Sequence, residues 1–116
     1  MAFNPDYTRD EPSRNEIDAL AGPALLEFGS PWCGYCRRTA PLVEQSFAEH
    51  PAIRHIRIED GSGRPLGRSF GVTLWPTLIF LKDGREVSRL VRPMDVRDIA
   101  AAMKAIDPAG ERAVPA

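Results

Sequence analysis

The sequence contains few groups that could hold a metal or cross-link a fold. Cys33 and Cys36 are the only cysteines among 116 residues, and two cysteines cannot form the disulfide framework of a small secreted scaffold. A structural zinc site takes four ligands, and beyond this pair the chain offers only His50 and His55. We expect His50 at a helix end and His55 on the surface of a strand, neither with a catalytic role. Arg37 rather than a histidine follows Cys36, which excludes the motif for covalent haem attachment. We therefore predict no metal site and no haem.

An excess of positive charge, a long apolar run and a phosphate-binding loop are also missing. With 15 Lys and Arg against 16 Asp and Glu, the formal charge is −1, so neither a nucleic acid nor an anionic membrane is an expected partner. The longest apolar stretch, residues 72–81, is too short to cross a bilayer. Gly61 and Gly63 lie in a linker without the strand-to-helix context of a phosphate-binding loop, so we expect no organic cofactor.

The first residues lead to a prediction about localisation. Residues 1–12 mix acidic residues and prolines without an apolar core, so they match neither a secretory signal nor a membrane span. With Met1 as the natural start, the sequence predicts a cytoplasmic protein. A mature secreted form whose leader had been replaced would have the same sequence, and this alternative stays open.

Length and composition predict one compact domain. An apolar fraction of 43% in 116 residues is enough to build a single core. The sequence divides into an N-terminal extension at residues 1–12, a domain at residues 13–109 and a C-terminal tail at residues 110–116. We expect the domain to be a monomer.

The predicted helices and strands alternate and then end in a hairpin and a helix. Ser13 and Glu16 form a capping box that predicts a short helix to residue 21, and Asp83-Gly84 is a typical hairpin turn. The other predicted elements are strands at residues 24–28, 53–59, 77–81 and 86–91, a helix at residues 33–50, a short helix near residues 66–70 and a closing helix from residue 93. No confident strand is found in residues 1–12. This order indicates an α/β fold with a mixed central sheet of four to five strands and helices on both faces.

The spacing of the two cysteines points to redox chemistry. A C-x-x-C motif that follows a buried strand and opens a helix places Cys33 at the helix N-terminus, where free N–H groups and the helix dipole favour thiolate over thiol. One helical turn brings Cys36 to about 5–6 Å from it between Cβ atoms, close enough for a disulfide after a small adjustment. We predict that Cys33 is the nucleophile and that Cys36 is the resolving thiol.

The residues between and after the cysteines are expected to support the pair. Gly34 is expected to admit the tight start of the helix, and Tyr35 to be exposed and to tune the pair. Arg37 and Arg38 add positive charge that stabilises a thiolate if their side chains point toward the site. They fit a solvated helix face equally well.

The sequence resembles the thioredoxin family over about residues 17–106. The resemblance covers several motifs in the family's order and spacing, namely Leu25-Leu26-Glu27-Phe28, Trp32-Cys33-Gly34-Tyr35-Cys36, Pro41, Phe70-Gly71-Val72, Trp75-Pro76-Thr77 and Lys82-Asp83-Gly84. It implies a thioredoxin fold around a redox-active Cys33–Cys36 disulfide. It also implies that Trp32 shields this disulfide.

The same resemblance assigns roles to Pro76 and Glu27. In the family a cis-proline faces the two sulfurs and its flanking backbone pairs with the substrate peptide, and Pro76 matches that position. Glu27 stands where the family usually has a buried aspartate that relays a proton to and from the second cysteine. A carboxylate in an apolar strand is a candidate base for Cys36. The alternative is that Glu27 reaches solvent or an arginine.

Three residues depart from the family pattern. Tyr35 replaces the proline usual after the glycine, and the residues between the two cysteines help to set the reduction potential. Trp75 precedes Pro76 where a smaller residue is usual, and Arg92 occupies the place of a glycine that lets the substrate backbone approach. Together Trp75 and Arg92 suggest a narrowed range of clients at the substrate-binding surface, unless Trp75 only fills the core.

The sequence therefore predicts an enzyme, a thiol–disulfide oxidoreductase that reduces protein disulfides. Its expected partners are client proteins with disulfides and an electron source that is either a reductase protein or glutathione, with no cofactor beyond its own disulfide. Three alternatives stay open: a disulfide oxidase or isomerase, a binding module with the same fold and little turnover, and a metal or iron–sulfur site shared across a dimer by Cys33 and Cys36.

Overall fold

The computed structural model describes residues 3–110. Its elements in chain order are α1 (Arg14–Asp18), β1 (Pro23–Gly29), α2 (Gly34–Phe47), β2 (Arg54–Glu59), α3 (Pro65–Ser69), β3 (Thr77–Lys82), β4 (Arg85–Val91) and α4 (Val96–Ile106). Every helix and strand predicted from the sequence is present, with ends that differ by a few residues. The capping box is confirmed, because the Ser13 hydroxyl accepts from the Glu16 N–H and the Glu16 carboxylate accepts from the Ser13 N–H.

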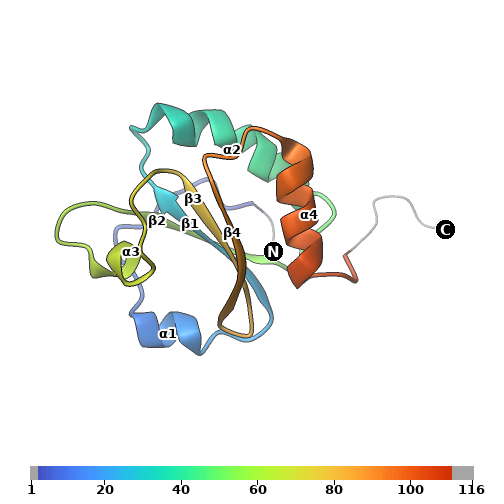
Figure 1. Ribbon diagram of the computed structural model, residues 1–116, viewed down its shortest axis with the longest axis horizontal. Coiled ribbons are helices and arrows are strands. Elements are labelled where there is room, and N and C mark those ends of the chain that lie inside the picture. The colour runs from blue at the N-terminus through green and yellow to red at the C-terminus, as the bar shows by residue number, and fades with distance from the viewer. Residues whose placement is uncertain (1–2, 111–116) are drawn as a thin grey trace.

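The strands form one mixed, four-stranded sheet in the order β2-β1-β3-β4 (Figure 1). β1 runs parallel to β2 and antiparallel to β3, and β3 pairs antiparallel with β4 through the Asp83-Gly84 turn. Both turn residues have positive φ angles, 52° and 78°, as a two-residue hairpin loop requires. The predicted α/β class, mixed sheet and hairpin are confirmed.

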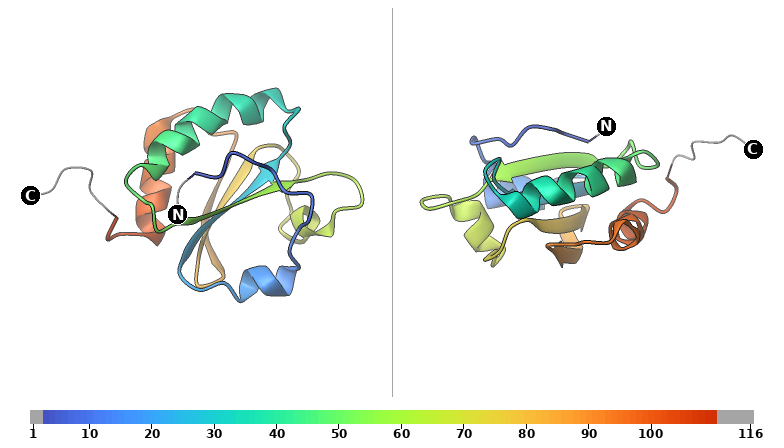
Figure 2. Two further views of the ribbon diagram at one scale, coloured as in Figure 1. Left: turned by 180° about the vertical axis from the view of Figure 1, so that it is seen from behind. Right: turned by 90° about the horizontal axis from the view of Figure 1, so that it is seen from above.

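Helices cover both faces of the sheet, and two apolar clusters hold them there. One cluster joins α2 and α4 to the sheet through residues such as Leu25, Val43 and Ile99. The other lies under α1 and α3 and includes Ile17 and Leu66. Figure 2 shows the helices on the two sides of the sheet. β1 is buried on both faces, as its short apolar run predicts.

The alternation of side chains along β1 and β2 decides which groups lie under α2. Leu25 belongs to the α2 cluster, so Glu27, two residues later, points to the same face. The parallel register pairs Leu25 with His55 and Glu27 with Arg57. The sheet therefore carries a carboxylate, an imidazole and a guanidinium side by side beneath α2.

The N-terminal segment lies along the outer edge of β2. Thr8 makes an isolated parallel bridge to Ile58. The Thr8 N–H donates to the Arg57 carbonyl at 2.8 Å, and the Thr8 carbonyl accepts from the Glu59 N–H at 2.9 Å. Phe3 packs against Phe47 with ring centroids 6.4 Å apart. Residues 3–12 thus cover the edge through one bridge and side-chain packing, which explains why no strand pattern is visible there. The predicted division into an extension at 1–12 and a domain at 13–109 stays a prediction.

The expectation that His55 lies on the strand surface is wrong. The Phe47 ring stacks on the imidazole at 4.8 Å, and Phe3 covers it from the N-terminal segment. Its Nδ1 accepts from the Asn4 N–H at 2.9 Å, so the ring hydrogen of the neutral tautomer is on Nε2. That nitrogen lies 2.8 Å from Glu27 Oε1 and donates to it.

Candidate active site

Cys33 occupies the N-cap of α2, as the C-x-x-C spacing predicts. Its backbone is extended, with φ −81° and ψ 120°, and its Sγ accepts a hydrogen bond from the Cys36 N–H at 3.2 Å. A sulfur that accepts from a free N–H of the first helical turn is stabilised as a thiolate. Both cysteines are free, and Cys33 is partly exposed.

Cys36 lies in a different environment. Its side chain is buried against Gly29, where an added Cβ would clash with the Cys36 sulfur, so β1 has to end in glycine. Burial, reinforced by the hydrogen bond to Cys33, raises the pKa of the Cys36 thiol to about 12. The Ser30 backbone and the Tyr7 hydroxyl lower the pKa of Cys36, against the larger effect of burial. The pair therefore combines an accessible sulfur with a buried sulfur whose thiolate depends on stabilisation by neighbouring groups.

Gly34 does not have the steric role expected of it. A Cβ added at Gly34 would meet no atom within 4 Å, and Gly34 is not among the glycines with positive φ. The tight helix start is provided instead by the N-cap geometry of Cys33. The role of Gly34 in substrate binding stays a prediction.

The bond before Pro76 lies next to Cys33. The Trp75–Pro76 peptide bond is cis, and the Trp75 carbonyl oxygen is 4.0 Å from Cys33 Sγ. The Trp75 indole N–H donates to Asp60 Oδ2 at 3.0 Å. Trp75 thus anchors its own loop to the linker after β2. Its main-chain carbonyl lies beside Cys33 Sγ.

Arg92 links the loop before β3 to the C-x-x-C turn. Its Nε donates to the Trp75 carbonyl at 2.7 Å, and its guanidinium lies 4.0 Å from the centroid of the Tyr35 ring. Arg38 lies over the same ring at 5.7 Å, so one of the two helix arginines faces the motif. Arg92 has a φ of 51°, a left-handed conformation in which a side chain is strained.

Apolar side chains are exposed on the segments that surround Cys33. Trp32 is 82% exposed, so its indole covers little of the site. The others are Tyr35, Leu74, Val91 and Met94, which belong to the C-x-x-C turn, the segment before Pro76 and the two sides of Arg92. Contiguous exposed apolar residues mark surfaces that bind other chains.

Glu27 is completely buried, and its carboxylate interacts with two neighbouring side chains. Oε1 accepts from His55 Nε2 at 2.8 Å and lies 3.2 Å from Arg57 Nε. Oε2 accepts from an Arg57 terminal nitrogen at 3.3 Å. Among the hydrogen bonds of residues 3–110, Glu27 makes none to Cys36. Of the two readings of Glu27, the structure shows the contact with an arginine, and its role as a base stays a prediction.

Sequence reasoning missed Tyr7. Its hydroxyl accepts from an Arg57 terminal nitrogen at 2.9 Å, and its ring lies 4.1 Å from the Arg57 guanidinium carbon. Tyr7 comes from the N-terminal segment, where no periodic pattern marked it. Only its place beside Gly29 and Cys36 in the folded chain identifies it as part of the site.

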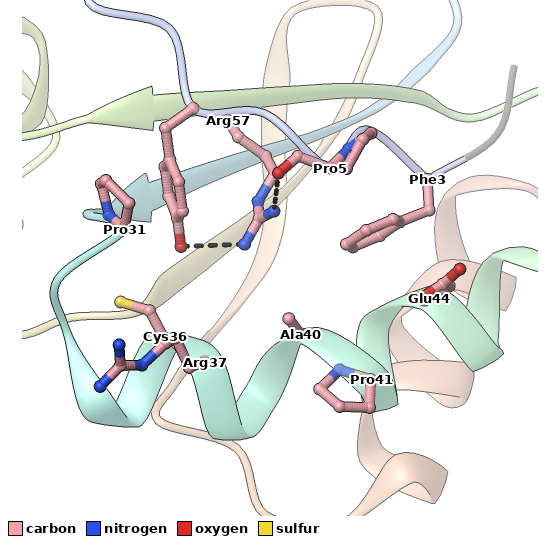
Figure 3. Close-up of a pocket in the computed structure, with 10 residues that line it drawn as sticks. Phe3, Pro5, Pro31, Cys36, Arg37, Ala40, Pro41, Glu44 and Arg57 are labelled. Atoms are coloured by element: carbon pink, nitrogen blue, oxygen red, sulfur yellow. Dashed lines mark hydrogen bonds between the residues drawn. The ribbon is translucent and has the colours of Figure 1, made fainter.

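A cavity of about 370 Å³ opens beside Cys36, between the N-terminal segment and α2. Figure 3 shows Cys36, Ala40 and Pro41 along α2 on one side of it and Phe3, Pro5 and Arg57 across from them. Cys36 lines the cavity and Cys33 does not. In residues 3–110, no three His, Cys, Asp or Glu side chains converge in a way that could hold a metal ion. Nor does that range contain a helix long and apolar enough to span a membrane.

Comparison with known proteins gives consistent matches. The family model described as thioredoxin matches residues 6–105. Over 79 residues the chain is 42% identical to a thioredoxin of Chlamydia muridarum, covering 66% of this chain and 76% of that protein. Over 81 residues it is 33% identical to a thioredoxin of Haemophilus influenzae, covering 67% and 74%. The structure of reduced thioredoxin 2 from Pseudomonas aeruginosa PAO1 superposes with a TM-score of 0.81 at 48% identity, covering 90% of this chain and 96% of that one.

Proposed function

The chain belongs to the thioredoxin family of thiol–disulfide oxidoreductases, and we propose that it works in the reducing direction on client proteins, with Cys33 as nucleophile and Cys36 as resolving thiol. The observation that carries the proposal is the contrast between a partly exposed, N-capping Cys33 and a Cys36 buried against β1. A client disulfide can reach only the first of these sulfurs.

Two exchanges then reduce the client. The Cys33 thiolate attacks a client disulfide, forms a mixed disulfide and releases the first client thiolate. Cys36 gives up its proton and attacks Cys33 Sγ, and the bond between Cys33 and the client breaks with its electron pair on the second client sulfur. Two electrons have passed to the client, its thiolates take up two protons, and the enzyme holds a Cys33–Cys36 disulfide.

The burial of Cys36 supports the reducing direction. A buried thiol with a raised pKa is a poor leaving group, so a disulfide that contains it is not readily broken by other thiols. Oxidases of this chemistry instead stabilise their reduced form. The electron source in this proposal is a reductase protein or glutathione, and the location is the cytoplasm, where thiols are kept reduced.

The direction can be tested by equilibrating the protein with glutathione buffers of known composition. We expect the reduction potential of the Cys33/Cys36 pair to lie below that of the glutathione couple by at least about 30 mV, which is a tenfold preference for giving electrons away. Thiol alkylation and mass spectrometry measure the reduced fraction in each buffer. A potential well above the glutathione couple would assign the protein to oxidation or isomerisation instead.

Replacing Arg92 by glycine is expected to speed the reaction with protein clients. The side chain now donates to the Trp75 carbonyl, a main-chain acceptor beside Cys33 that an extended client segment would use. Removing this competing bond is worth about one hydrogen bond, or roughly fivefold in rate with insulin. The positive φ of Arg92 suits glycine, so the fold should tolerate the change.

The control for Arg92→Gly is a small aromatic disulfide that needs no main-chain pairing. Its rate should stay the same in both proteins. If the variant reduced insulin more slowly than the parent, Arg92 would be a binding contact for clients and not a competitor of their backbone.

A further inference from the structure

The resolving step needs a thiolate at Cys36, and the structure shows which group meets it. Cys36 Sγ and the Tyr7 hydroxyl lie on the same side of Gly29, where a Cβ would come 2.6 Å from the sulfur and 3.1 Å from the phenolic oxygen. Both side chains line the same cavity, and the Tyr7 hydroxyl lowers the pKa of Cys36 against the larger effect of burial. The Tyr7 hydroxyl therefore lies beside a reacting atom.

The hydrogen bonds of Arg57 decide whether the Tyr7 hydroxyl is free to donate toward Cys36. A guanidinium can only donate, so the Tyr7 oxygen is the acceptor in its 2.9 Å contact with Arg57. The single hydrogen of the hydroxyl then remains for the sulfur. Burial, together with the Glu27 charge, raises the pKa of Tyr7 far above its usual range, so the phenol keeps that hydrogen. Donation from Arg57 also polarises the hydroxyl and strengthens its own donation.

Glu27 is not in a position to do the same work. Its two oxygens accept from His55 and Arg57, and none of the hydrogen bonds of residues 3–110 joins the carboxylate to Cys36. The Arg57 terminal nitrogen that donates to Glu27 Oε2 also donates to the Tyr7 hydroxyl, and the other terminal nitrogen donates to the Asn4 and Pro5 carbonyls at 3.3 and 3.0 Å. The hydrogen bonds therefore run from Glu27 through Arg57 to Tyr7, which lies beside the sulfur.

We propose that Tyr7 is a catalytic residue of the resolving step, whose hydroxyl donates a hydrogen bond to the Cys36 sulfur as its thiolate forms, and that Glu27 acts on Cys36 only through Arg57. This inference rests on the proposed roles of the two cysteines. The proton leaves Cys36 for water in the adjoining cavity (Figure 3), and the client thiolate released from Cys33 takes up another from solvent. The number of bonds and electrons in the exchange is unchanged, and Tyr7 itself neither gains nor loses a proton.

A single turnover with dithiobis(nitrobenzoate), a symmetric aromatic disulfide, separates the two steps. Attack by Cys33 releases one coloured thiolate at a rate proportional to reagent concentration, and resolution by Cys36 releases the second at a rate independent of it. In Tyr7→Phe, we expect the second phase to slow by about 10- to 100-fold, the effect of losing a hydrogen bond to a charged group. The first phase should keep the rate of the parent protein.

The matched control is Phe3→Leu, which loosens the packing of the same N-terminal segment without removing a hydroxyl. It should leave both phases near the parent rates. Equal slowing of both phases in Tyr7→Phe, no slowing of the second, or the same slowing in Phe3→Leu would overturn the proposal. A parent protein whose Cys33 gives no first phase would contradict the proposed function itself, a result distinct from these.

Discussion

Cys33→Ser is expected to abolish the reduction of insulin disulfides, with a loss of at least about three orders of magnitude. The variant lacks the one sulfur that is both partly exposed and capped by the first turn of α2. A serine hydroxyl at the same place is not ionised near neutral pH and does not attack a disulfide. The measurement is the rate of insulin precipitation with dithiothreitol as the electron source, compared with the rate without protein.

Cys36→Ser is expected to stop the same reaction at a different point. Cys33 still attacks, but the mixed disulfide has no neighbouring thiol to resolve it, so client proteins stay covalently attached. Mass spectrometry should show one client per protein, released by dithiothreitol, and the variant with both cysteines replaced should show none. If Cys33→Ser reduced insulin as fast as the parent protein, the assignment of the nucleophile would be wrong.

The helix starts and the hairpin turn were predictable from short stretches of sequence. The capping box at Ser13 and the Asp83-Gly84 turn each depend on residues a few positions apart, and their geometry follows from backbone preferences that a short window contains. The same is true of Cys33 at the start of α2. The resemblance to a family then added what no window could contain, the position of the Trp75–Pro76 bond beside Cys33.

The interior of the site was less predictable, because it depends on contacts between distant parts of the chain. Along β2, the alternation of polar residues is typical of an exposed face, and it led to the wrong placement of His55. The N-terminal segment covers that face, and Tyr7 reaches Arg57 across 50 positions of sequence. Nothing in the composition of residues 3–12 shows which strand edge they cover. The partners of Glu27 were unknown for the same reason, although the resemblance had located Glu27 itself.

Glu27→Gln is expected to destabilise the fold by about 3–5 kcal/mol, because it removes the negative charge that compensates a buried guanidinium. Arg57 is only 4% exposed, and Glu27 is fully buried. The amide keeps the shape of the carboxylate, so little of the loss comes from a cavity. A domain of this size has a total stability of roughly 5–15 kcal/mol, so the urea midpoint should fall by a large fraction. Far-UV circular dichroism across a urea series measures this loss.

The matched control is the ion pair between Glu86 and Arg89, which has a 2.6 Å contact and lies on the surface of β4. Glu86→Gln should cost no more than about 1 kcal/mol, because water already solvates both charges. The variant that combines Glu27→Gln with Arg57→Met should be more stable than Glu27→Gln alone, since it no longer buries an uncompensated charge. A double variant less stable than Glu27→Gln would show that Arg57 stabilises the fold mainly through the Asn4, Pro5 and Tyr7 oxygens. In that case the guanidinium holds the N-terminal segment on the sheet whether or not its charge is neutralised.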